Sequence, residues 1–235
     1  MHHPKSLRRR AFVATLPVMA GYLVLGMGFG VILESKGFGV LWALGMSTFI
    51  YAGSMQFVAV NLLTGGASLI TTALTTLMVN ARHLFYGISM IEKYRGAGKK
   101  KPYLIFALTD ETYSLVCRDE DEKEDAAERR RYYFYVSLFN HSYWITGSVL
   151  GALLGTVLTG STEGIDFALT ALFVTVFVEQ WKSTGDHKPA VIGVAASVLC
   201  LVIFGPANFL IPAMITITVA LSVLGARRGE LKRHA

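Results

Sequence analysis

Charged residues are scarce in this sequence. Asp, Glu, Lys and Arg make up 16% of the 235 residues, whereas hydrophobic residues make up 53%. A soluble domain typically has about 25% charged residues. The scarcity is also uneven, because residues 11–33 and 40–62 contain no charge at all. This composition argues against a soluble enzyme and predicts a polytopic integral membrane protein.

The sequence also lacks a cysteine framework and the common catalytic motifs. Its two cysteines, Cys117 and Cys200, lie in or beside apolar runs, so neither a disulfide framework nor a metal site is expected. There is no HExxH, GxSxG or Walker A pattern. The glycines of residues 26–30 lie inside an apolar run, where glycine indicates helix packing rather than a nucleotide loop. We expect no enzyme activity, no cofactor and no bound metal.

Long apolar runs dominate what is present. A helix needs about 20 apolar residues to cross a bilayer core, and five or six of the runs reach that length. The runs do not alternate as the strands of a membrane barrel do, so helices are expected. The sequence predicts an all-α membrane helix bundle of about seven to eight segments, some short or broken. The runs are residues 11–33, 40–62, 67–91, 103–117, 132–159, 165–181, 190–205 and 207–225.

Basic residues collect at the ends of these runs. The net charge is +6, but Lys and Arg flank the apolar segments, as the positive-inside rule describes, and do not form a nucleic-acid patch. Both termini and the charged loop at residues 118–131 are therefore expected on the cytoplasmic side of the cell (inner) membrane. Lys99, Lys100 and Lys101 conflict with this if the first three runs all cross. A break within residues 40–62 would bring these lysines back to the inside.

The two halves of the single membrane domain resemble each other weakly. Gly26 and Gly30 match Gly151 and Gly155 at a constant offset along the chain. We interpret residues 8–117 and 129–226 as halves of a duplication, an arrangement common in transporters with a substrate site at mid-membrane.

Polar residues inside apolar runs are functional candidates, because a polar group in hydrocarbon is costly unless it is paired or hydrated. Ser54 and Gln56 lie in the middle of one run, where Gly53 and Ser54 together favour unwinding of the helix. Such a break frees backbone groups for a polar ligand. The alternative is a small-residue packing contact, with Gln56 hydrogen-bonded across helices.

Arginine and histidine occur together in another run. Arg82 is suited to a substrate carboxylate, because a guanidinium forms a forked pair with that group. Structural pairing, or extension of the side chain to the membrane surface, is the alternative. Asn80 and His83 flank it, and His83 has the chemistry of a proton relay or of a satisfied structural histidine.

Two adjacent carboxylates form the sharpest cluster. Asp110 and Glu111 lie in a short apolar segment and point about 100° apart on a helix, so they are not expected to share one role. One is expected to pair with Arg82 while the other carries a proton or faces a substrate ammonium. Thr109 and Thr112 are suited to capping a broken helix. The alternative is a hydrated helix end.

Weaker candidates occur later in the chain. Glu179 and Gln180 end one run, beside Trp181 and Lys182, which resemble an interfacial anchor. The pair at residues 140–141, Asn-His, lies in an otherwise uncharged run.

The polar clusters carry a likeness to a known family. The sequence resembles the AzlC family of branched-chain amino acid permeases over nearly its whole length. The resemblance implies the large subunit of a two-component exporter, with a small AzlD-like membrane subunit as partner. It rests on YAGSMQF (residues 51–57), NARHLFYG (80–87), LTDETY (108–113) and FVEQW (177–181).

We therefore expect a secondary transporter that exports neutral apolar amino acids. A helix broken near Gly53 and Ser54 would bind the substrate carboxylate through backbone N–H groups. Asp110 or Glu111 would meet the ammonium group or carry a coupling proton. The alternatives are a channel-like facilitator for a small solute and a non-transporting membrane scaffold.

Overall fold

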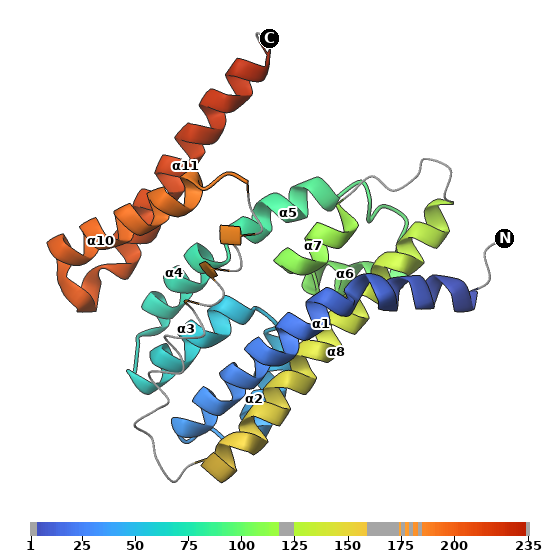
Figure 1. The fold of residues 1–235 in the computed structure, drawn as a ribbon, viewed down its shortest axis with the longest axis horizontal. Coiled ribbons are helices and arrows are strands. Elements are labelled where there is room, and N and C mark those ends of the chain that lie inside the picture. The colour runs from blue at the N-terminus through green and yellow to red at the C-terminus, as the bar shows by residue number, and fades with distance from the viewer. Residues whose placement is uncertain are drawn as a thin grey trace. The chain divides into compact units, whose positions relative to one another are not determined.

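The computed structural model describes residues 4–117, 125–158, 174, 177–178, 181–182 and 185–233. Every regular element in this part of the chain is helical, so the predicted all-α class is confirmed (Figure 1). The elements are α1 (Pro4–Ser35), α2 (Val40–Phe49), α3 (Gly53–Thr64), α4 (Leu69–Val79), α5 (Arg82–Met90), η1 (Gly98–Lys100), α6 (Lys101–Phe106), α7 (Asp110–Val116), α8 (Ala126–Leu158), α10 (Lys188–Asn208) and α11 (Leu210–Arg233).

The chain forms two compact units. The first contains Met1–Thr72 and Asn80–Leu172, and the second contains Ala73–Val79 and Phe173–Ala235. The predicted duplication stays a prediction, because residues 159–173 of its second half lie outside the described residues.

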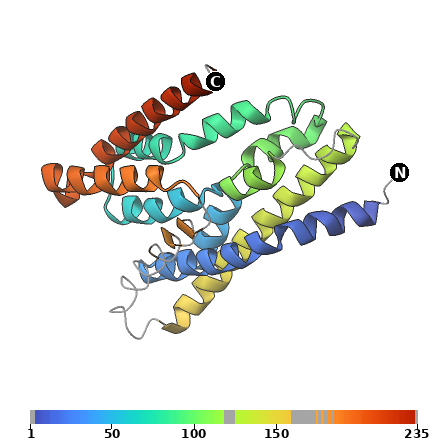
Figure 2. The same cartoon turned by 45° about the horizontal axis from the view of Figure 1, so that its top comes forward.

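Helices α1 and α8 form the frame of the first unit and lie side by side in both views (Figures 1 and 2). They run in the same direction, since Arg10 of α1 lies over the Tyr132 ring of α8 and Glu34 lies against Gly155. Glycines allow this close approach. A Cβ added at Gly30 would collide with the Ser148 backbone of α8.

Basic residues from three parts of the chain meet at one end of the α1–α8 pair. Arg10 lies 4.8 Å from the centre of the Tyr132 ring, and Lys100 lies 4.6 Å from that of Phe134. The guanidinium of Arg130 donates a 3.4 Å hydrogen bond to the carbonyl of Arg95. Lys100 thus lies at the same end as the basic start of α1, a gathering of basic residues of the kind that the positive-inside rule describes.

Breaks in the helices make this arrangement possible. The run at residues 40–62 divides at residues 50–52, which confirms a break in this run, but Gly53 and Ser54 are helical and begin α3 instead of being unwound. The short run at residues 103–117 divides at residues 107–109, between α6 and α7. The run at residues 67–91 also divides, between α4 and α5. Two helices in the described part of the chain, Leu7–Ser35 and Lys188–Gly205, are each long and apolar enough to cross a membrane alone.

The second unit contains a pair of helices, α10 and α11. Gly205 interrupts α10 with a φ of 71°, a conformation that glycine adopts without steric cost. Val198, Val202 and Ile203 on α10 are exposed although they are strongly apolar. Exposed aliphatic surface of this kind suits contact with lipid tails.

Candidate functional site

The break between α6 and α7 carries a polar network. Thr109 has an extended backbone and begins α7 as its N-cap, accepting a 3.3 Å hydrogen bond from the Thr112 N–H. The hydroxyl of Tyr22, on α1, donates a 2.6 Å hydrogen bond to Glu111 Oε2. The same Tyr22 oxygen lies 2.7 Å from Thr109 Oγ1. The predicted capping by threonine is therefore present, and Glu111 is fixed to α1.

The network continues into α8. The side-chain amide of Asn140 donates a 3.1 Å hydrogen bond to Thr112 Oγ1, and both side chains are fully buried. Asn140 Oδ1 is also buried, and no hydrogen-bond partner for it occurs among the described residues. The α6–α7 break therefore joins α1, α7 and α8 through polar side chains.

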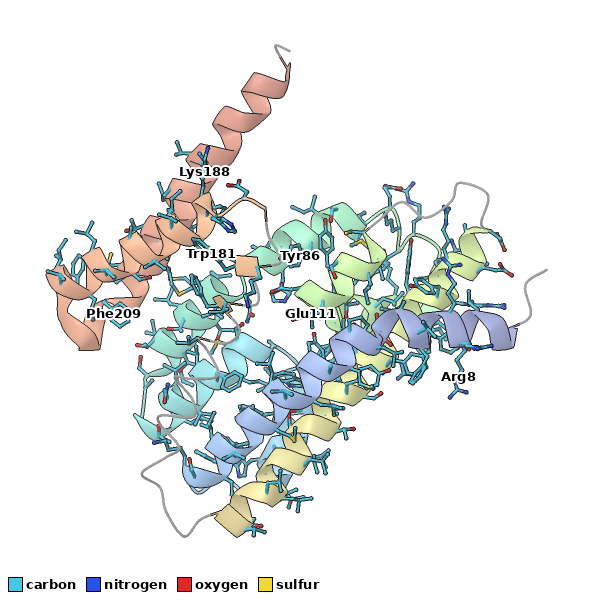
Figure 3. The ribbon with its side chains drawn as sticks, viewed as in Figure 1. Arg8, Tyr86, Glu111, Trp181, Lys188 and Phe209 are labelled. Atoms are coloured by element: carbon cyan, nitrogen blue, oxygen red, sulfur yellow. The ribbon has the colours of Figure 1, made fainter. Side chains whose placement is uncertain are left out.

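This network lies at mid-depth of the α1–α8 pair. Tyr22 is 14 residues after Arg8 and 13 before Ser35 along α1. At 1.5 Å per residue, it is about 20 Å from both Arg8 and Ser35. Figure 3 shows Glu111 at the middle of α1 and Arg8 toward its N-terminal end. A carboxylate at this depth matches the placement of substrate or coupling groups in transporters.

The two neighbouring carboxylates, Asp110 and Glu111, have different surroundings in the structure. Asp110 is half-buried in the first turn of α7, where the helix dipole favours a negative charge. Glu111 reaches α1 instead. The backbone of Arg82 begins α5, but its side chain is outside the described residues, so its predicted pairing with either acid stays a prediction.

The break between α2 and α3 has a different set of partners. Gln56 is fully buried, and its amide donates a 3.2 Å hydrogen bond to Ser47 Oγ. Its carbonyl oxygen accepts a 2.9 Å hydrogen bond from the indole of Trp144 on α8. Trp144 also packs against Gly53, where an added Cβ would lie 3.1 Å from the indole ring. Ser54, in the first turn of α3, is exposed.

His141 completes the broken end of α2. The N–H groups of Ile50 and Tyr51 both bond to the Met46 carbonyl, which leaves the Ser47 carbonyl without its usual helical donor. His141 Nε2 lies 3.1 Å from that carbonyl. Since a carbonyl only accepts, Nε2 carries the proton, and Nδ1 of the neutral ring accepts from the Tyr103 hydroxyl at 3.1 Å.

The sequence prediction gave little weight to these α8 residues. Asn140 and His141 were recognisable as adjacent polar residues in an uncharged run, and the structure gives each one a different helix break. Tyr22 and Trp144 were missed. Their signal is an aromatic ring with a polar group inside an apolar run, because such a group finds a partner when it is buried.

Asn80 and His83 lie apart from both networks, at a cavity of about 450 Å³. His83 Nδ1 lies 3.1 Å from the Asn80 carbonyl. Their cavity is lined by α5, α6 and residues 50–52. Of the remaining candidates, Glu179 and Gln180 lie outside the described residues.

Comparisons with known proteins give the chain a family context. Residues 17–158 match the family model described as AzlC protein. The chain is 45% identical to the branched-chain amino acid transport protein AzlC of Bacillus subtilis, over 92% of this chain and 84% of that protein. It is 40% identical to an uncharacterized membrane protein of Helicobacter pylori, over 94% of this chain and 96% of the relative. No solved structure matches the chain significantly.

Proposed function

Because the chain belongs to the AzlC family, we propose that it is a secondary transporter that exports branched-chain amino acids across the cell membrane. The Bacillus subtilis relative is named as a branched-chain amino acid transport protein, and other relatives are named as membrane proteins. The proposal takes the substrate class from the name of that relative and further proposes that transport is directed out of the cell. It assigns no enzymatic step to the protein.

The hydrogen bond between Tyr22 and Glu111 is the observation that carries this proposal. It joins an ionisable carboxylate to a point of α1 about 20 Å from both Arg8 and Ser35, on a helix that starts at a break. A buried scaffold gains nothing from a carboxylate there, because hydrocarbon disfavours it. A transporter uses such a group to meet the substrate ammonium or to carry a coupling proton. We assign this role to Glu111.

The gathered basic residues support a cytoplasmic location for that end of the α1–α8 pair. The N-terminus and the loop at residues 118–131 would then be cytoplasmic, together with the turn that contains Lys100. We further propose that a small AzlD-like membrane subunit completes the transporter, as the family resemblance implies.

Transport into inverted membrane vesicles tests the proposal. Vesicles from cells that express the chain with its small subunit are expected to accumulate radiolabelled leucine above the external concentration when energised. Collapse of the proton gradient and membrane potential should abolish this accumulation. Vesicles that lack the protein give the background, and uptake equal to that background would refute the proposal.

The same vesicles separate the two alternative functions. A channel-like facilitator would equilibrate leucine without saturation and without response to the gradient. A scaffold would show no leucine flux of its own, with or without substitution of Glu111.

A further inference from the structure

A cavity of about 450 Å³ in the first unit extends from the basic end of the α1–α8 pair toward the two helix breaks. Its lining includes Tyr94 and Lys101 at one extreme and Tyr51 and Leu108 at the other. Tyr94 contacts Tyr133, near the start of α8, with ring centres 6.2 Å apart. Tyr51 contacts His141, eight residues later on α8, with ring centres 4.3 Å apart. The cavity thus extends about 12 Å along α8, from the basic end to mid-depth.

The walls of this cavity are mainly apolar. Leu84 and Met90 of α5 face Ile105 and Phe106 of α6 across it. Its polar side chains are Asn80 and His83 near the start of α5, Lys101 at the basic end, and the hydroxyl-bearing rings of Tyr51 and Tyr94. His83 Nδ1 must donate to the Asn80 carbonyl, which leaves Nε2 of the neutral ring as a hydrogen-bond acceptor. An apolar cavity of about 450 Å³ with few polar groups is typical of a small-molecule site.

Tyr51 connects the cavity with the carboxylate network. It lines the cavity, and its ring meets the Tyr22 ring edge-on at 6.5 Å. Tyr22 in turn donates to Glu111. The Tyr51 backbone has a φ of 45°, which is unusual for a residue other than glycine. Its buried hydroxyl has no partner in standard hydrogen-bond geometry among the described residues. Strained backbone of this kind concentrates at functional sites.

Gly87 leaves open space in the cavity wall. It lies inside α5, where glycine destabilises a helix relative to alanine. Close packing does not account for it, because a Cβ added there would meet no atom within 4 Å. The absent side chain instead enlarges the cavity that Gly87 lines.

We propose that this cavity holds the branched aliphatic side chain of the amino-acid substrate, and that Gly87 sets the size it accepts. The inference rests on the transport function proposed above and adds where the apolar part of the substrate binds. The charged end of the substrate then faces Tyr51 and the network of Glu111. The lining of the cavity extends to Lys101 at the basic end, which is the end proposed above to be cytoplasmic, and this suits the loading step of an exporter.

A change of size at residue 87 tests the assignment. Gly87→Leu adds four carbons to the cavity, and Gly21→Leu adds the same group to an exposed glycine of α1 that also has no atom within 4 Å of an added Cβ. Inverted vesicles containing each variant and the small subunit are assayed for the KM of labelled leucine and labelled alanine. Gly87→Leu is expected to raise the KM for leucine relative to alanine about tenfold or more. Gly21→Leu should keep the wild-type ratio.

Two further variants provide the test if Gly87→Leu is poorly expressed. Gly87→Ala should shift the ratio in the same direction by a smaller factor. Leu84→Ala, which enlarges the lining at a side chain that is 61% exposed, should favour phenylalanine over leucine. An unchanged leucine-to-alanine ratio in a Gly87 variant that transports would overturn the cavity assignment and leave the transport function intact. Wild-type vesicles that move no branched-chain amino acid would instead overturn the proposed function.

Discussion

The two helix breaks that meet the middle of α1 and α8 differ in chemistry. At the α2–α3 break, the partners are neutral, and the Gln56 amide is bonded at both its nitrogen and its oxygen. At the α6–α7 break, the carboxylate of Glu111 accepts a hydrogen bond from Tyr22. The Gln56 side chain holds one arrangement, because an amide has no charge to change and both of its ends are bonded. The second contains a group whose charge can change.

Helix α8 supports both breaks from neighbouring positions. Asn140 donates a hydrogen bond to Thr112 of α7. At the other break, His141 bonds to the Ser47 carbonyl and Trp144 bonds to the Gln56 side chain. A shift of α8 would therefore disturb both breaks together. The comparison predicts that substitutions at the α2–α3 break reduce stability, whereas substitutions at the α6–α7 break reduce transport.

Glu111→Gln is expected to give the largest effect. It keeps the shape of the side chain but removes the charge that Tyr22 contacts. A hydrogen bond to a charged group contributes about 1.5–3 kcal/mol, which corresponds to roughly a 10- to 150-fold change in rate. Energised vesicles should lose leucine accumulation by about that factor, while leucine exchange without a gradient is less affected.

The matched control is Glu92→Gln. Glu92 is an exposed carboxylate paired with Arg95 at 2.9 Å, outside the network. The Glu92→Gln variant should accumulate leucine as the wild type does. If Glu111→Gln accumulated leucine as fully as the wild type, the proposed functional difference between the two breaks would be wrong.

Trp144→Phe tests the α2–α3 break. The substitution removes the indole N–H and leaves the buried oxygen of Gln56 without its donor. An unsatisfied buried acceptor costs about 1–3 kcal/mol of stability. Thermal unfolding of the purified protein in detergent should show the loss, and the KM for leucine should stay near the wild-type value. Trp42→Phe, at a half-exposed indole of α2, is the control and should be nearly neutral.

The presence of the breaks was predictable, since Gly53 and Ser54 lie in one apolar run and threonines flank the two acids of another. The first break nevertheless falls just before Gly53, at residues 50–52. Their partners were not. Tyr22 lies 89 residues from Glu111, and Trp144 lies 88 from Gln56. Apolar runs carry little amphipathic pattern, so a single sequence does not show which face of α1 or α8 turns inward. The glycines were correctly interpreted as packing positions, but not as a parallel contact between α1 and α8.

The smallest predicted effect concerns the cap of α7. Thr109→Ala removes the hydroxyl that accepts from the Thr112 N–H and lies 2.7 Å from the Tyr22 oxygen. Loss of an N-cap typically costs about 1 kcal/mol, and Thr109→Ser should retain most of it because serine supplies the same oxygen. Thr64→Ala is the control, because that hydroxyl bonds only carbonyls of its own helix, Val60 and Asn61, in α3. Thermal unfolding in detergent should show that the wild type and Thr109→Ser are more stable than Thr109→Ala.

Because the Thr109 hydroxyl also contacts Tyr22, Thr109→Ala should slow leucine accumulation as well, whereas Trp144→Phe should not. Thr109→Ala and Trp144→Phe are compared at matched amounts of folded protein. Equal leucine accumulation by the two variants would contradict the proposed difference, because both breaks would then contribute only to stability.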